Sequence, residues 1–162
     1  MIDEKVMLTP NKNGDTRTAP RYVTFRKVLQ ASVSHREEVR EVMYLISGEL
    51  KQQGKDHDWT KITDSKQFFK DFKATIKYGD DFTKGKWYQK HVHEERHHPF
   101  SYCHEDINLL DIIETIVDCV CAGKSRSGEV RPLEFSTDIL EKAVKNTVTL
   151  IDNITEVKKE NK

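Results

Sequence analysis

The sequence predicts an all-α protein, a single-domain bundle of about six helices, and three observations support this. Apolar residues recur at helical spacing through most of the chain, and strand-like alternation is absent. A length of 162 residues is typical of one domain with one sizeable core. No internal repeat or low-complexity segment interrupts the pattern. We therefore expect an irregular N-terminal arm over residues 1–20 and one helical domain over residues 21–159.

The expected helices follow from capping residues, glycines and a proline. Thr24 is a candidate N-cap, and Gly54 is expected to end a long helix. Phe68, Phe69, Phe72 and Ile76 recur on one helix and are expected to face inward. The expected helices cover residues 25–31, 32–53, 65–77, 86–98, 109–122 and 137–158, each bound being approximate.

Composition and charge exclude several classes of function. The 27 basic residues balance 27 acidic ones, so no global field favours nucleic acid or an anionic membrane. The three cysteines are an odd number and no signal peptide precedes them, which indicates a reducing cytoplasm without disulfides. No apolar stretch reaches the ~20 residues of a membrane span.

The dipeptide His57-Asp58 is the first candidate metal site. Gly54 and the polar residues after it favour a sharp turn there, which could aim both side chains at one cation. Imidazole nitrogen and carboxylate oxygen together suit Zn, Mn, Fe or Ni better than Ca. Lys61 follows three residues after Asp58.

Other histidines could complete such a site. His35 lies on the apolar stripe of the long helix, although a histidine there could equally be a core residue. His91, His93, His97 and His98 form a cluster, which could alternatively be part of a solvated charged helix. On a helical wheel these four side chains cannot all point at one ion, unless the helix unwinds near the His-His-Pro step.

Asp111, Glu114 and Asp118 form an acidic stripe on one helix. No Lys or Arg lies between residues 106 and 123 to relieve their repulsion, so a cation or a histidine is the expected partner. The alternative is an ordinary polar helix face. Asp111 and Asp118 are separated by about 10.5 Å along the axis, so only one can bind a given ion.

Three basic residues follow the acidic helix. Lys124, Arg126 and Arg131 could bind a phosphate oxygen near the metal, or could be ordinary solvated charges.

The order of these motifs resembles the HD-domain metal-dependent phosphohydrolases. The span from about residue 34 to 151 resembles more closely a family of short, mostly phage-encoded HD-like proteins of unassigned function. The resemblance is carried by His35, His57-Asp58-Trp59-Thr60-Lys61, His97-His98-Pro99 and the run Leu109-Leu110-Asp111-Ile112-Ile113-Glu114-Thr115-Ile116-Val117-Asp118. The sequence departs from that pattern at Phe100, where a glutamate is expected.

The resemblance implies an HD-like helical fold and assigns roles to these residues. His35, His57, Asp58 and Asp118 would bind one divalent ion. Asp111 would then orient a histidine of the 91–98 cluster, or hold Lys61 or an arginine. His91, His97 and His98 would bind a second ion or stabilise charge on the phosphoryl group. Glu114 would be an acid or base that orients water. Lys61 would act on the substrate phosphate, with Lys124 and Arg126 as further substrate-binding residues.

The implied function is metal-dependent hydrolysis of a phosphate ester, with a nucleotide as the substrate that the HD resemblance favours. The ion would be Mn, Fe, Zn, Ni or Mg, in one or two copies. The alternative is a metal-stabilised, non-catalytic binding module, such as a phage protein that sequesters a nucleotide or blocks a host factor. A phage-encoded protein would act in the host cytoplasm. The sequence indicates no particular oligomeric state.

Overall fold

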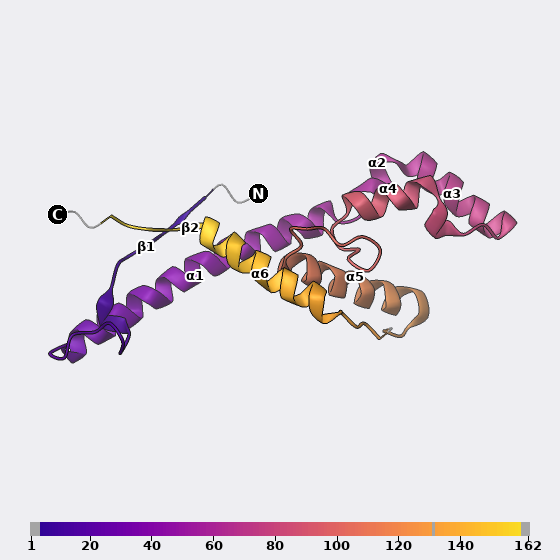
Figure 1. The fold of residues 1–162 in the computed structure, drawn as a ribbon. Coiled ribbons are helices and arrows are strands. Elements are labelled where there is room, and N and C mark those ends of the chain that lie inside the picture. Colours follow the sequence, from indigo (N-terminus) through magenta and orange to yellow (C-terminus); the bar gives the residue numbers. More distant parts are fainter. Residues whose placement is uncertain (1–3, 131, 160–162) are drawn as a thin grey trace. The chain divides into compact units, whose positions relative to one another are not determined.

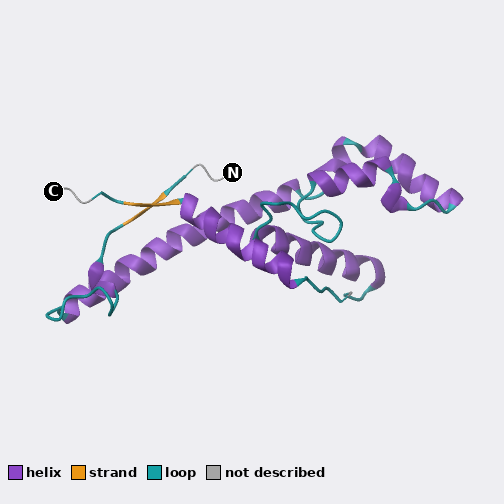
Figure 2. Ribbon diagram, viewed as in Figure 1, coloured by secondary structure: helices purple, strands orange, loops and turns teal. Residues whose placement is uncertain are grey.

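Helices dominate the computed structural model, which describes residues 4–130 and 132–159 (Figure 1, Figure 2). The predicted all-α class is confirmed, since the strands among these residues are two short ones, β1 (Val6–Leu8) and β2 (Thr155–Val157). None of the described helices is both long and apolar enough to cross a membrane. The helices are α1 (Phe25–Asp56), α2 (Trp59–Thr63), α3 (Ser65–Tyr78), α4 (Lys86–Glu94), α5 (Leu109–Ser127) and α6 (Thr137–Asn153), with 3-10 turns η1 (Lys12–Gly14) and η2 (Phe82–Lys84).

The chain divides into two compact units. Unit 1 comprises residues 1–51 and 148–162, and unit 2 comprises residues 52–147. The boundary predicted between residues 20 and 21 falls inside unit 1. Helices α1 and α6 each contribute residues to both units.

Unit 1 contains the two strands. β1 pairs with β2 in parallel, with Val6 opposite Thr155. The predicted irregular arm therefore includes β1 and η1, although residues 1–3 lie outside the described part. The last helix, expected to reach residue 158, ends at Asn153 instead. Ile154 and the β-branched residues of β2 favour an extended chain there.

α1 is one continuous helix of 32 residues. The prediction of two helices broken after Ala31 and ended by Gly54 was wrong. A glycine inside a helix costs about 1 kcal/mol relative to alanine, which the rest of a long helix can offset. The chain turns instead at Asp58, whose φ of 59° is left-handed, a conformation that Asp adopts more readily than most residues.

α2, α3, η2 and α4 form one part of unit 2. α3 begins after Asp64 and ends at Gly79, whose φ is 73°, as the sequence indicates. Phe68 packs on Trp87, with ring centroids 4.5 Å apart. Phe69 and Ile76, expected to face inward, are 61% and 72% exposed, because α3 packs through a narrow stripe centred on Phe68.

α4 is shorter than predicted. It ends at Glu94 rather than at Pro99, because Glu95 takes an extended conformation and turns its carboxylate inward. The following segment, residues 95–108, is irregular. The side chains of His97 and His98 therefore do not follow the directions that helical spacing would give them.

α5 and α6 enclose the apolar core of unit 2. Ile107, Ile112 and Ala143 are its buried members. Asn108 caps α5, and its side chain accepts a hydrogen bond from Leu110 N at 2.8 Å. α5 extends five residues beyond the expected end at residue 122. The helix that carries the acidic stripe is therefore fixed at its start and packed along one face.

Candidate metal centre

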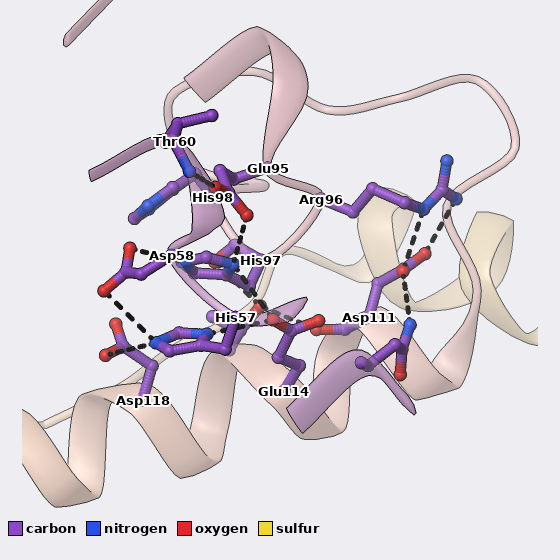
Figure 3. A network of polar contacts seen from close by, with 12 residues as sticks. His57, Asp58, Thr60, Glu95, Arg96, His97, His98, Asp111, Glu114 and Asp118 are labelled. Carbon is purple, nitrogen blue, oxygen red and sulfur yellow. Dashed lines mark hydrogen bonds and ion pairs between the residues drawn. The ribbon is translucent and has the colours of Figure 1, made fainter. Parts of the chain in front are cut away.

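Unit 2 brings together side chains from four places in the chain (Figure 3). His57 and Asp58 lie at the turn between α1 and α2, His91 lies on α4, and the irregular segment after α4 supplies His97 and His98. α5 supplies the carboxylates of Glu114 and Asp118. The residues whose coordinating atoms gather are Asp58, His91, His97 and His98 in one group and His57, His97 and Asp118 in a second.

In the first group, Asp58 Oδ1 lies 3.6 Å from His91 Nε2 and 3.7 Å from His97 Nε2. His98 Nε2 lies 2.7 Å from His91 Nε2. Two donors that each lie about 2.1 Å from a tetrahedral ion are about 3.4 Å apart. The oxygen–nitrogen separations are thus close to those of a coordinated ion.

The second group has similar spacing. His57 Nε2 lies 3.4 Å from Asp118 Oδ1 and 3.4 Å from Asp58 Oδ2. The coordinating atoms of His57, His97 and Asp118 all lie within 4.8 Å of one another. His97 belongs to both groups, so the arrangement offers places for one ion or for two neighbouring ions.

Three buried side-chain atoms of this cluster lack hydrogen-bond partners: Asp58 Oδ1 and both ring nitrogens of His97. Burying a polar atom without a partner costs about 1–3 kcal/mol, and more for a charged group. A cation between Asp58 Oδ1 and His97 Nε2 would satisfy these two atoms, and nitrogen with oxygen suits Zn, Mn, Fe or Ni. The donor set therefore fits a divalent ion.

Glu114 and Thr60 orient the histidine rings. Glu114 Oε1 lies 3.0 Å from His57 Nδ1 and 3.1 Å from His97 Nδ1. Thr60 Oγ1 lies 2.6 Å from His91 Nδ1. When the Nδ1 atoms of His57 and His91 carry the proton and donate it to Glu114 and Thr60, the Nε2 atoms of these two rings carry no proton. This is how neighbouring oxygens fix the ring nitrogen that binds a metal.

Burial keeps two histidines of the first group neutral. It lowers the pKa of His91 to about 3, with a further contribution from the charge of His98. Burial likewise lowers the pKa of His98 to about 4, with a contribution from the charge of His97. Neutral imidazole is the form that ligates a metal, so both rings have the charge state of a metal ligand near pH 7.

The carboxylates are held in their charged form. Burial alone would raise the pKa of Asp58, but the hydrogen bond and charge of Lys61 lower it. Burial opposes ionisation of Glu114 too, yet its bonds from His97 and His57 lower that pKa. Burial disfavours a charged His57 ring, whereas Glu114 and the neighbouring aspartates outweigh this and raise its pKa. The cluster therefore concentrates negative charge.

Lys61 and Arg96 each hold an aspartate. Lys61 Nζ forms a close ion pair with Asp58 Oδ2. Arg96 binds Asp111 through two bonds, Nε to Oδ1 at 2.9 Å and Nη2 to Oδ2 at 2.8 Å. Asp111 is fully buried and lies outside both donor groups. Of the partners expected for Asp111, the structure shows the arginine. In unit 2, Asp111 therefore holds Arg96 in place and has a structural role.

Three polar residues of the site were missed by sequence reasoning: Thr60 and Glu95, which are buried, and Arg96, which is half-buried. Glu95 is 4% exposed, and its Oε1 accepts a hydrogen bond from Thr60 N at 2.9 Å. Arg96 ties residues 95–108 to α5. Thr60 could have been noticed inside the His-Asp-x-x-Lys motif, but Glu95 and Arg96 look like surface charges in a polar run.

The remaining residues that the sequence predicted as ligands or phosphate-binding groups lie outside the two donor groups. His35 belongs to unit 1, where it lines a cavity of about 380 Å³, and its role as a ligand stays a prediction. Lys124 is exposed near the end of α5. Arg126, also exposed, lines a cavity together with Lys61 and Asp118. Arg131 lies outside the described residues.

Comparison with known proteins identifies a family but no function. No curated protein matches the chain. No solved structure matches it. Residues 24–157, which include both donor groups, match the family of unknown function DUF5662, and the chain therefore belongs to that family.

Proposed function

We propose that the protein is a metal-dependent phosphohydrolase that acts on a phosphate ester, with a nucleotide as the favoured substrate. The observation that carries the proposal is the pair of donor groups sharing His97, with buried atoms of Asp58 and His97 left without hydrogen-bond partners. Side chains from a turn, two helices and a loop converge there, as they do where helical folds assemble metal sites.

A divalent ion bound at such a centre supplies Lewis acidity toward a phosphoryl oxygen and toward water. The residues of the chain would do the rest. Asp58, His91 and His97 would hold the ion, and Glu114 would keep the rings of His57 and His97 aimed at it. Glu114 Oε2 could also accept a proton from an attacking water.

Lys61 is the proposed phosphate-binding residue of the motif. Its ammonium pairs with Asp58 Oδ2, so it lies next to the place where an ion would sit. If Asp58 held an ion, its ion pair with Lys61 would weaken, and the Lys61 ammonium would be available to a phosphoryl oxygen. Arg126 lines the same cavity and is a second candidate cation.

A second function is favoured by one specific observation. The first donor group contains four protein ligands, and His91 and His97 are each only 2% exposed. Four protein ligands without an open position are typical of structural metal sites. A metal-stabilised, non-catalytic binding module is therefore the alternative.

Elemental analysis and a hydrolysis panel test these proposals together. The purified protein is loaded with Mn or Zn and assayed against nucleotides, a simple phosphomonoester and a phosphodiester. Bound metal with turnover supports the hydrolase, and bound metal without turnover supports the binding module. Absence of bound metal would refute both.

Lys61→Ala refines the test. We expect this variant to keep its metal at pH 7 and to lose phosphate binding or turnover at least about tenfold, as removal of one charged contact does. Lys66→Ala, which removes an exposed lysine of α3, is the matched control. Loss of metal from Lys61→Ala would assign Lys61 a structural role instead.

A further inference from the structure

A cavity of about 500 Å³ opens onto the metal centre. Its volume is within the range of pockets that bind small organic molecules. Part of its lining is polar and belongs to the centre or adjoins it: Lys61, His91, His98, Asp118 and Arg126. The other part is aromatic: Phe68, Phe72, Phe82, Trp87 and Tyr88.

The aromatic rings form a connected wall. Phe82 lies 5.8 Å from Trp87 and 6.3 Å from Phe72, measured between ring centroids. Trp87 stacks on His91 of the centre at 4.4 Å, with only 19° between the ring planes. Because the Trp87 ring stacks on this histidine, the wall begins in direct contact with a candidate metal ligand.

This wall differs from an ordinary core. Protein interiors are close-packed and have few voids larger than a water molecule. Trp87 is buried like a core residue, but Phe72 is 46% exposed and borders a cavity together with the other rings. The apolar core of unit 2 is a separate cluster around Ile107, Ile112 and Ala143.

We infer that this cavity binds a phosphate ester whose organic part is a planar aromatic ring, with the phosphate at the metal centre and the ring against the aromatic wall. The inference rests on the proposed function, since that function places the phosphate at the centre. Lys61 and Arg126 would neutralise the phosphate. Aromatic side chains tolerate any flat ring that offers a π-face, and stacking on one favours binding by about tenfold.

Two chemical sources share this description, a nucleoside monophosphate and an aryl phosphate. Calorimetric titration of the Mn-loaded protein with non-hydrolysable phosphonates separates them. One pair of probes is phenylphosphonate and methylphosphonate. The other is the phosphonate analogue of adenosine 5′-monophosphate and that of ribose 5-phosphate. We expect the aromatic member of at least one pair to bind about tenfold more tightly than its partner.

Variants of the wall show whether the preference arises there. Phe72→Ala should remove most of the preference, and because Phe72 is at the rim the protein should remain folded. Phe82→Ala provides a second variant for the same wall. Phe69→Ala is the matched control, since Phe69 is an exposed phenylalanine of α3 outside the cavity lining. Arg126→Gln should weaken all four probes by a similar factor.

The outcomes distinguish this inference from the proposed function. A preference in the adenosine pair alone identifies a nucleotide site, one in the phenyl pair alone an aryl phosphate site, and one in both supports the general class. Equal affinities within both pairs, or a preference unchanged in Phe72→Ala and Phe82→Ala, would overturn the inference while leaving the hydrolase proposal intact. A preference without turnover of any ester would support the site and refute the hydrolase.

Discussion

Replacing Glu114 with glutamine tests how the proposed metal centre is assembled. Glu114 Oε1 lies 3.0 Å from His57 Nδ1 and 3.1 Å from His97 Nδ1, so one carboxylate orients two rings. Glutamine keeps the length of the side chain but loses the charge and presents an amide N–H₂ in place of one oxygen. If that amide faces a ring N–H, two donors meet and the ring turns away.

The expected effect is a loss of metal affinity. Removing one oxygen that orients a ligating histidine costs about 10–100-fold in affinity, or about 1.4–2.7 kcal/mol. Glu114 serves two histidines, and charge-assisted bonds are about twice as strong as neutral ones. We therefore expect the upper end of this range for Glu114→Gln.

Competition with a fluorescent chelator measures the dissociation constant for Zn or Mn. Glu141→Gln makes the same chemical change at an exposed position of α6 and is the control. Affinity within twofold of the wild type would refute the orienting role. Complete loss of binding would also refute it, because Glu114 would then be a direct ligand.

Three further predictions concern the same unit. His57→Ala should release metal and lower the thermal midpoint of the metal-loaded protein, because ligand binding energy adds to folding free energy; full occupancy by elemental analysis would contradict this. Arg96→Ala leaves Asp111 buried without its ion-pair partner and should cost about 3 kcal/mol in urea unfolding of the metal-free protein, whereas a loss below about 1 kcal/mol would show that Asp111 finds other partners. In EDTA, stability should fall as pH drops from about 6.5 to about 4, because the unfolded chain takes up protons that folded His91 and His98, with pKa values lowered to about 3 and 4, do not. Stability that stays constant over that range, followed by urea unfolding at each pH, would contradict the burial of these neutral rings.

Local sequence patterns were sufficient to predict the helical class and several helix ends. Helices were expected to begin near residues 65, 109 and 137, and α3, α5 and α6 begin there, because helix starts depend on near neighbours in the sequence. The motif His57-Asp58 and the stripe of Glu114 and Asp118 were recognisable for the same reason. Residue type and spacing are enough to identify them as candidate metal ligands.

Helix propensity gave wrong helix ends where longer-range contacts compete with it. Gly54 is a weak helix former, yet α1 continues past it and the chain turns at Asp58 instead. The helix of the histidine cluster ends at Glu94, five residues before Pro99, because Glu95 is drawn inward to bond Thr60 N. No local signal marks that bond, since its partners are 35 residues apart.

The sequence by itself determined that this protein is helical and which residue types could bind a metal. Tertiary structure alone decided which of them meet: His97 joins both donor groups because the chain leaves the helix before it, and Asp111 is taken by Arg96. It also placed an aromatic wall one helical turn from His91. These outcomes depend on the packing of segments far apart in the chain, and residue spacing carries no information about such packing.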